Sequence, residues 1–456
     1  MGAGIAAHLA NAGIPVLLLD IAPRELKPEE EAKGLSLESP QVRGRIVKEL
    51  FEAAKKLKPA PFMLADNAKL ITLGNFADDM AKLKDCDLVI EAVVERLDIK
   101  HQVFGEVEKH RKPGSFIATN TSGIPIKSIA EPFSDDFKKH FVGIHFFNPP
   151  RYMKLVELIP TEWTDGEMAC KLSGFLDQRL GKGVVPAKDR PNFIANRIGT
   201  FAMMATVHEM VAMGFTPTEV DQMTGKAIGH AKSATFRTAD LVGLDVLVHV
   251  NRNLYPAVPD DEDRDVFLLP DVIEKMLEKN LLGDKTKGGF YKKSKNAEGK
   301  TEIHELDLTT FEYKPQEKTK FASIEAAKGI DDMNKRIKAL VWGEDRVGEF
   351  LWKTMSRTFR YAANRIPEIA DTIVEVDNAI KWGFGWEIGV FETWDAIGLK
   401  RSVERMKAEG QAVPTSIEKM LAAGAETFYK NENGNLSFFD LVGGEYKPLP
   451  ERPGVT

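Results

Sequence analysis

The chain has 456 residues, of which 43% are hydrophobic and 29% charged, and its formal net charge is -6. This length is enough for two or more domains, and the composition is typical of a folded globular protein. The balance of 62 basic and 68 acidic side chains argues against a dedicated nucleic-acid-binding protein, which would need a basic face.

The sequence has no signature of a membrane span, a disulfide framework or a metal site. No apolar run approaches about 20 residues, and the N-terminus has no basic segment followed by an apolar one. Two cysteines, Cys86 and Cys170, are too few for a disulfide framework, and the nine histidines show no metal-ligand spacing such as H-E-x-x-H. We therefore expect a soluble, cytoplasmic protein without a metal.

A glycine cluster opens the chain. Residues 2–7 read GAGIAA and match G-x-G-x-x-G/A, and Asp20 ends the next apolar run, where a ribose-binding acid is expected. The motif binds pyrophosphate only when a strand leads into the turn, and no strand precedes Met1. We favour the register in which Gly2 is the third glycine, used for helix packing; a plain packing role is the alternative. We therefore expect the second half of a dinucleotide-binding unit, without its first strand and G-x-G.

Short apolar runs of strand length recur through the first 190 residues. They are residues 16–20, 69–73, 87–94, 115–120, 142–147, 154–159 and 182–187. Helical patterns separate most of the early runs, and several runs are apolar on both faces, as in a parallel sheet covered by helices. This pattern predicts an α/β, Rossmann-like doubly wound domain over residues 1–189. An amphipathic segment rich in Lys and Glu predicts a helical arm at about 24–64 that stands out from the sheet.

Beyond the sheet domain the pattern changes to long helices, and the chain repeats itself. RIGTF at 197–201 recurs as RVGEF at 346–350, an offset of 149 residues. FRTADLVGL at 236–244 matches FETWDAIGL at 391–399, an offset of 155 residues. We predict two homologous all-α domains joined by a polar linker. Their ranges are 190–315 for the first, 316–340 for the linker and 341–456 for the second.

One histidine and one glutamate are candidates for proton transfer. His145 lies in the predicted strand 142–147 and Glu157 in the strand 154–159, at positions symmetric about Arg151. If the two strands are neighbours, the side chains meet. Histidine is the usual general base near neutral pH, and a carboxylate on one ring nitrogen fixes its tautomer and stabilises the imidazolium. The alternative is a core histidine beside an incidental strand acid.

Four stretches together resemble the L-3-hydroxyacyl-CoA dehydrogenase family of fatty-acid β-oxidation. They are IEAVVERLDIKHQVF (90–104), ATNTSGIPI (118–126), GIHFFNPPRYMKLVELI (143–159) and RPNFIANRIGTF (190–201). The resemblance covers almost the whole chain. The doubled helical region is similar to the long form of the family, in which an enoyl-CoA hydratase can be fused to the same polypeptide.

The resemblance implies roles for further residues. His145 and Glu157 correspond to the catalytic pair, and Ser122 and Asn196 to side chains near the 3-oxygen and carbonyl of the substrate. Asp20 would bind the adenosine ribose, and an acid there without an arginine directly after it favours NAD over NADP. The residues implied around the nicotinamide half are Ala92, Glu95, Lys100, Ser122 and Asn148.

Taken one by one, several of these residues have structural alternatives. TNTS at 119–122 could be a capped turn, and Asn196 could lie on a helix surface. Glu95 and Lys100 could be a solvated pair at a helix start.

The resemblance implies NAD-dependent oxidation of an L-3-hydroxyacyl-CoA thioester to 3-ketoacyl-CoA. Enoyl-CoA hydratase or thiolase components are candidate partners, and nucleic acid is not. In two-domain relatives the helical domain dimerises; here the second repeat would replace the partner, which predicts a monomer. Two alternatives stay open. One is a cofactor-impaired acyl-CoA-binding or scaffolding fragment of a β-oxidation complex, and the other a dehydrogenase of a CoA-free 3-hydroxy acid.

Overall fold

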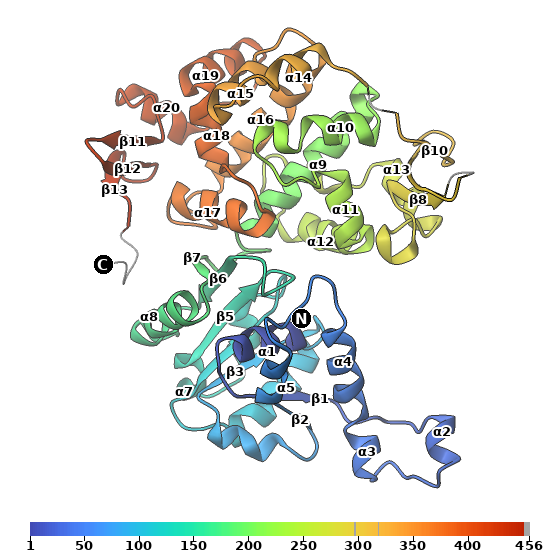
Figure 1. Ribbon diagram of the computed structural model, residues 1–456. Coiled ribbons are helices and arrows are strands. Elements are labelled where there is room, and N and C mark those ends of the chain that lie inside the picture. Colours follow the sequence, from blue (N-terminus) through green and yellow to red (C-terminus); the bar gives the residue numbers. More distant parts are fainter. Residues whose placement is uncertain (296–297, 318, 451–456) are drawn as a thin grey trace. The chain divides into compact units, whose positions relative to one another are not determined.

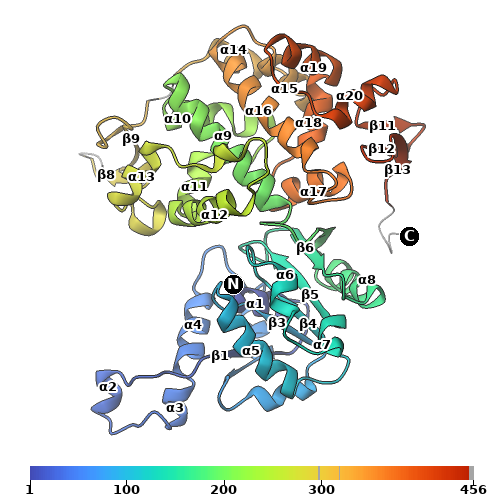
Figure 2. The same ribbon diagram turned by 180° about the vertical axis from the view of Figure 1, so that it is seen from behind.

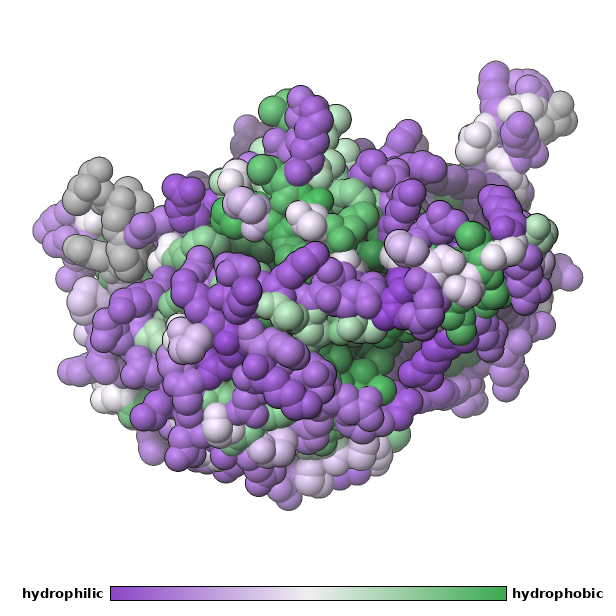
Figure 3. Space-filling model, turned by 90° about the horizontal axis from the view of Figure 1, so that it is seen from below, coloured by the Kyte–Doolittle hydropathy of each residue, from purple (hydrophilic) through white to green (hydrophobic). Residues whose placement is uncertain are grey.

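The computed structural model describes residues 1–295, 298–317 and 319–450 (Figure 1). The chain divides into two compact units, one ending at Asp189 and the other beginning at Arg190. Among the described residues, no helix has both the length and the apolar character that a membrane crossing requires. The face drawn in Figure 3 is mostly hydrophilic, with hydrophobic residues in smaller patches.

Residues 1–189, all of them described, form seven strands in two sheets, and these are the seven strands that the sequence predicts. They are β1 (Val16–Asp20), β2 (Ile71–Asn75), β3 (Leu88–Glu91), β4 (Phe116–Thr119), β5 (Phe141–Phe146), β6 (Leu155–Pro160) and β7 (Gly183–Pro186). β1 and β2 form a parallel pair, and β3 to β7 form a five-stranded sheet in chain order. Only β5 and β6 pair antiparallel, so the larger sheet is mixed.

Helix α1 (Gly2–Asn11) packs against both sheets. Its Ile5 belongs to a hydrophobic core with Ile144 of β5, whereas Ala6 belongs to a second core with Ile71 of β2. The two sheets are not hydrogen-bonded to each other. The apolar faces of this helix therefore connect them.

The remaining helices of the first unit cover the sheets or lie in the predicted arm. They are α2 (Pro28–Glu31), α3 (Pro40–Arg43), α4 (Arg45–Lys55), α5 (Leu97–His110), α6 (Ile126–Ala130), α7 (Asp135–Lys139) and α8 (Gly166–Gly174), with the short turns η1 (Ala65–Leu70), η2 (Met80–Asp85) and η3 (Phe175–Arg179). The arm is only partly as predicted. α2 and α3 stand away from the sheets (Figure 1), but α4 buries Val47, Phe51 and Ala54, and Phe51 joins the core of β2.

The second unit contains the two repeats. The first has α9 (Ala195–Met213), α10 (Pro217–Met223), η4 (Lys226–Ile228), α11 (Phe236–Val242), α12 (Leu244–Ala257), η5 (Arg264–Phe267), α13 (Asp271–Glu278), η6 (Asp284–Thr286), β8 (Tyr291–Lys295), β9 (Thr301–Leu306) and β10 (Tyr313–Pro315). The second has α14 (Ala322–Ala327), α15 (Met333–Val341), α16 (Arg346–Asn364), α17 (Ile373–Phe384), α18 (Val390–Ile397), α19 (Leu399–Ala408), α20 (Thr415–Ala422), β11 (Tyr429–Glu432), β12 (Asn435–Asp440) and β13 (Glu445–Pro448).

Two features of this unit differ from the sequence prediction. The repeats are not purely α-helical, because each ends in a three-stranded antiparallel sheet. The segment predicted as a linker contains α14 and α15. Asp332 caps α15 through a hydrogen bond to Lys335 N, and Ile337, Leu340 and Val341 are buried, so this helix belongs to the packed unit.

The same buried aspartate device occurs in both repeats. Asp221 accepts hydrogen bonds from the backbone N–H groups of residues 235–237 at the start of α11 and from the hydroxyl of Tyr291. Asp377, 156 residues later, makes the corresponding contacts at the start of α18 and with Tyr429. Burial raises the pKa of Asp221 to about 6 and that of Asp377 to about 7. The internal repeat is therefore visible in individual hydrogen bonds.

The long helices α9 and α16 lie side by side in both views (Figures 1 and 2). Phe201 stacks on Tyr361 with ring centroids 3.8 Å apart, and Phe215 meets Phe350 at 5.3 Å. The start of α9 thus faces the end of α16. Phe215, just beyond the end of α9, faces the start of α16, so the helices run antiparallel. The two repeats bury each other's central helix.

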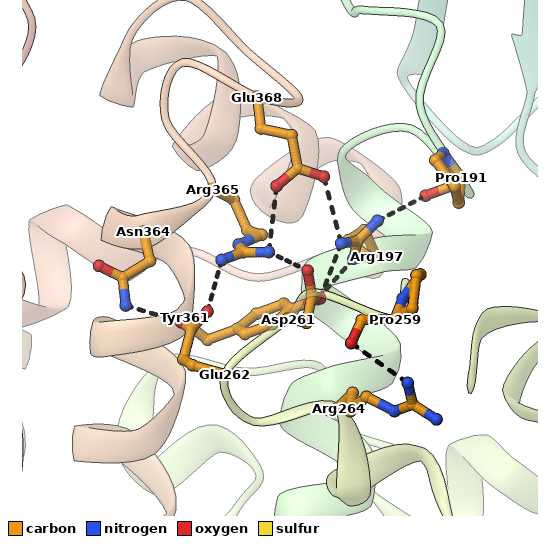
Figure 4. A network of polar contacts seen from close by, with 10 residues as sticks. All are labelled: Pro191, Arg197, Pro259, Asp261, Glu262, Arg264, Tyr361, Asn364, Arg365 and Glu368. Carbon is orange, nitrogen blue, oxygen red and sulfur yellow. Dashed lines mark hydrogen bonds and ion pairs between the residues drawn. The ribbon is translucent and has the colours of Figure 1, made fainter. Parts of the chain in front are cut away.

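A buried polar network joins the repeats beside this helix pair (Figure 4). Arg197 donates to Asp261 at 2.7 Å, and the hydroxyl of Tyr361 donates to the same carboxylate at 2.6 Å. Arg365 contacts the other oxygen of Asp261, and Glu368 lies 3.3 Å from Arg197 and 3.0 Å from Arg365. The Arg197 side chain is fully buried. Asp261 is the more buried of the two carboxylates that the arginines share, with 6% of its side chain exposed against 33% for Glu368.

The substitution Asp261→Asn is expected to destabilise the helical unit strongly. It replaces the buried carboxylate by a neutral amide and leaves the partly exposed Glu368 as the carboxylate that Arg197 and Arg365 still share, so the free energy of unfolding should fall by about 3–5 kcal/mol. Urea denaturation followed by tryptophan fluorescence measures it. Glu262→Gln is the matched control, because this neighbouring side chain is 45% exposed and its ion pair should contribute below about 1 kcal/mol. Equal losses in the two variants would contradict the assignment.

Candidate active site

His145 and Glu157 are in direct contact on neighbouring strands. The antiparallel register of β5 and β6 places His145 opposite Glu157, so the two side chains lie on the same face of the sheet. His145 Nδ1 is 2.7 Å from Glu157 Oε2. The exposed fractions are 6% for His145 and 0% for Glu157. A carboxylate can only accept, so Nδ1 carries the proton of this bond, and Nε2 is the nitrogen suited to accept another.

The imidazole has further support from two residues that sequence reasoning missed. The ring of Phe147 lies 4.6 Å from the ring of His145. Asn120 Oδ1 accepts the backbone N–H of Phe146 at 2.9 Å, which ties the end of β5 to the loop after β4. Asn120 stands inside the TNTS motif directly after a strand, and that position was the available signal. The only signal for Phe147 was its place two residues after His145, at the end of the predicted strand 142–147.

The turn between β5 and β6 is held at both ends. The buried ammonium of Lys182 donates to the carbonyl oxygen of Met153 at 2.9 Å and to that of Pro150. Burial lowers the pKa of Lys182 to about 8. On the other side, Arg151 donates to the carbonyl oxygen of Ala60 at 2.7 Å. These anchors fix the register that brings the histidine and the carboxylate together.

Glu95 organises the loop that carries Ser122. Its Oε1 accepts the backbone N–H groups of residues 122–124 at 3.0, 2.9 and 3.3 Å, and also the hydroxyl of Thr121. Burial alone would raise the pKa of Glu95, but the Thr121 hydroxyl, these N–H groups and the Lys100 ammonium lower it below its ordinary value. The glutamate is therefore an ionised cap for this loop.

Lys100 is buried rather than solvated. It is 1% exposed, and its Nζ donates to both oxygens of Glu91 at 2.9 Å and lies 3.5 Å from Glu95. The hydroxyl of Thr119 also donates to Glu91, at 2.6 Å. The alternative of a solvated pair at a helix start was therefore wrong for Lys100, whereas its partner Glu95 keeps 29% of its side chain exposed. Glu91 lies inside the stretch 90–104, but its role was not predicted because it depends on burial at the end of β3.

The residues predicted to hold a dinucleotide lie at the ends of strands and at the start of α1. Asp20 ends β1 and is half-buried. A Cβ added to Gly2 would lie 3.7 Å from Ala92 Cβ, just after β3, an ordinary contact. A Cβ added to Gly4 would lie 3.2 Å from Pro150, so the closer approach is at Gly4. Gly4 thus lets the start of α1 lie close to Pro150, and Gly2 lies beside the end of β3.

Asn148 is exposed in the turn after β5. Its position follows His145 by three residues on the same strand end. The carboxylate of Asp20 and the amide of Asn148 are both suited to hydrogen-bond ribose or amide groups of a dinucleotide. Each of the two side chains therefore suits one polar group of NAD.

Asn196 belongs to the second unit, where it is half-buried in the first turn of α9. The segment before the helix is unusual, because Asn192 and Phe193 both have positive φ angles, of 61° and 53°. Such strained conformations persist only where surrounding contacts enforce them. Arg197, the next residue, donates to the carbonyl oxygen of Pro191 at 3.2 Å. The buried network of Figure 4 therefore holds the start of this helix.

Comparison with known proteins gives consistent results for both units. The family model described as 3-hydroxyacyl-CoA dehydrogenase, NAD binding domain, matches residues 1–190, and the model of the C-terminal domain of the same family matches residues 193–293. A probable 3-hydroxyacyl-CoA dehydrogenase of Deinococcus radiodurans is 49% identical over 65% of this chain and 81% of its own length.

A longer relative and a solved structure extend the comparison. A probable 3-hydroxyacyl-CoA dehydrogenase of Bacillus subtilis is 51% identical over 99% of this chain, which spans 56% of that relative's length. The crystal structure of 3-hydroxybutyryl-CoA dehydrogenase from Escherichia coli shares the fold, with a TM-score of 0.61 and 20% identity over 93% of this chain and 97% of that chain. The chain therefore belongs to the 3-hydroxyacyl-CoA dehydrogenase family.

Proposed function

We propose that this chain catalyses the NAD-dependent oxidation of an L-3-hydroxyacyl-CoA to the 3-ketoacyl-CoA. The observation that carries the proposal is the buried contact of 2.7 Å between His145 Nδ1 and Glu157 Oε2. A histidine oriented by a carboxylate is a general base whose protonated form is stabilised in place. Membership of the family supports the substrate class and the cofactor.

Each side chain of the site has a distinct task in this reaction. His145 Nε2 takes the proton of the 3-hydroxyl group, while Glu157 stabilises the imidazolium that forms. Bound NAD would supply the acceptor for the hydride that leaves C3. The hydroxyl of Ser122 and the amide of Asn196 hydrogen-bond to oxygens of the substrate without adding a competing charge. The alcohol thus loses one proton to the histidine and one hydride to the nicotinamide, and becomes a ketone.

The first unit supplies the residues that bind the cofactor. Asp20 binds the adenosine ribose, and Gly2 and Ala92 keep the start of α1 close to the end of β3, beside the dinucleotide. Glu95 and Lys100 act through the loop that carries Ser122. Their many contacts with protein groups support a positioning role.

Oligomeric state, partners and location are further parts of the proposal. The antiparallel packing of α9 and α16 supports a monomer, because one repeat covers the helix face of the other. Association with enoyl-CoA hydratase or thiolase components and a cytoplasmic location stay predictions from the sequence.

The substitution His145→Gln is expected to lower kcat by about 100- to 10 000-fold, because glutamine cannot take the hydroxyl proton. Steady-state kinetics with 3-hydroxybutanoyl-CoA measures turnover, and calorimetry should show a Kd for NAD within about twofold of the unaltered protein, which leaves binding interactions in place. His249→Gln, on the exposed side of α12, is the control and should keep full activity. Turnover within tenfold of normal in His145→Gln would refute the assignment.

Glu95 and Ser122 are expected to be coupled, because the glutamate acts through the loop that carries the serine. Glu95→Ala and Ser122→Ala should each lower kcat/KM, and the double variant should lose much less than the product of the two losses. A double-mutant cycle on kcat/KM measures this coupling. Glu106→Ala on the exposed face of α5 should change neither value. Independent, multiplicative losses would show that Glu95 does not position Ser122.

A further inference from the structure

A cavity of about 80 Å³ lies within the helical unit, at the seam between the two repeats. α9 and α11 of the first repeat line it, together with α16 and α18 of the second. His230 and Trp386 stack across the seam with ring centroids 3.5 Å apart and planes at 12°. These residues follow Gly229 and Gly385, which both adopt left-handed backbone conformations 156 residues apart. The cavity is therefore built where equivalent positions of the repeats meet.

The lining of this cavity is uncharged. Among the described residues that form it there is no Asp, Glu, Lys or Arg. Burial lowers the pKa of His230 to about 3, so its imidazole is neutral at physiological pH. Burying a charged ligand group without a partner is strongly unfavourable. A ligand that enters must therefore be neutral in the part that it buries.

The lining also has few hydrogen bonds to offer. Seven threonines line the cavity, four from the first repeat and three from the second. Each hydroxyl already donates within the protein, as Thr206 does to the carbonyl oxygen of Ala202 at 2.9 Å and Thr354 to that of Phe350 at 3.0 Å. Methyl groups, methionine side chains and aromatic rings remain for a ligand. This surface suits a hydrocarbon.

One face of α9 leads from the proposed substrate contact into the cavity. Asn196 stands in the first turn, and Gly199, Met203 and Thr206, which line the cavity, follow at spacings of three and four residues. Residues at these spacings share one side of a helix. At 1.5 Å per residue, the path from Asn196 to Thr206 is about 15 Å long. The ring of Phe384 packs directly on Gly199 on this face, so a ligand that follows the face must pass beside that ring.

We propose that this cavity binds the distal methylene groups of the substrate's acyl chain. The inference rests on the proposed function, since Asn196 places the thioester end at the start of the same helical face. One water needs about 10–15 Å³ of such space, so the cavity has room for roughly six groups of methylene size. Chains of medium length therefore reach it, whereas a four-carbon acyl group stays near Asn196.

The first test compares butanoyl-CoA and decanoyl-CoA, which lack the 3-hydroxyl group and do not react. Isothermal titration calorimetry on the full chain measures both affinities. Each methylene that enters an apolar site should strengthen binding about fourfold, so decanoyl-CoA is expected to bind at least tenfold more tightly. Equal affinity for the two thioesters overturns the proposal.

Variants that fill the cavity test whether the chain-length dependence of the affinity arises there. Ala202→Phe fills the cavity from α9 and should bring the ratio of the two affinities close to one. Ala212→Phe, the same substitution at an exposed position of α9, should keep the ratio. Thr358→Leu fills the cavity from α16 and replaces Ala202→Phe if circular dichroism shows that the latter does not fold. A folded, filled variant that keeps the wild-type ratio overturns the proposal.

A spectroscopic arm does not depend on filled variants. 10-Bromodecanoyl-CoA should quench the fluorescence of Trp386, and this quenching should disappear in Trp386→Phe; equal quenching in both proteins overturns the proposal.

Oxidation of 3-hydroxybutanoyl-CoA by the unaltered chain tests the proposed function separately. Activity without any chain-length gain retains the function and refutes the cavity. A chain-length gain without activity refutes the function and retains the hydrocarbon site.

Discussion

The site depends on the register between β5 and β6. Side chains alternate along a strand, so a shift of one residue would turn His145 and Glu157 to opposite faces of the sheet. Both side chains are buried, and a buried carboxyl group needs a hydrogen-bond partner. The histidine is that partner, and the carboxylate in turn orients the histidine. Lys182 and Arg151 hold the intervening turn from two sides, so the register is fixed by groups outside the pair.

The first unit supports its reactive groups through buried charge. Lys100 connects the carboxylates of Glu91 and Glu95, which lie at the end of one strand and in the loop beyond it. The two carboxylates then hold Thr119 and the backbone around Ser122. A site held in this way keeps its geometry, because His145 and the loop of Ser122, both proposed to contact substrate, are fixed by Glu157 and Glu95.

The two repeats have diverged in the use of one arginine. Arg197 lies in the shared network with Asp261, Tyr361 and Arg365. Its counterpart Arg346 instead donates to the carbonyl oxygen of Met213 at 2.6 Å and lies over the ring of Phe215. The first repeat thus carries Arg197, next to Asn196, and Tyr361 and Glu368 of the second repeat contact this buried arginine.

The sequence predicted the elements that local patterns determine. The seven strands are apolar runs of the right length, and the positions of His145 and Glu157 about Arg151 predicted their meeting. The repeat motifs predicted two copies. The misses depend on tertiary contacts: the burial of Lys100 follows from Glu91, and the packing of α4 from its Phe51. The small sheets that end the repeats were missed because their strands are short and largely exposed, with little apolar alternation.

The most direct measurement is a crystal structure of the chain with NAD and acetoacetyl-CoA, a 3-ketoacyl product. The account predicts the C3 oxygen within about 2.6–3.2 Å of His145 Nε2, with Nδ1 still on Glu157 and C3 facing the nicotinamide ring. A C3 oxygen bound by other groups, with the imidazole turned away from it, would contradict the account.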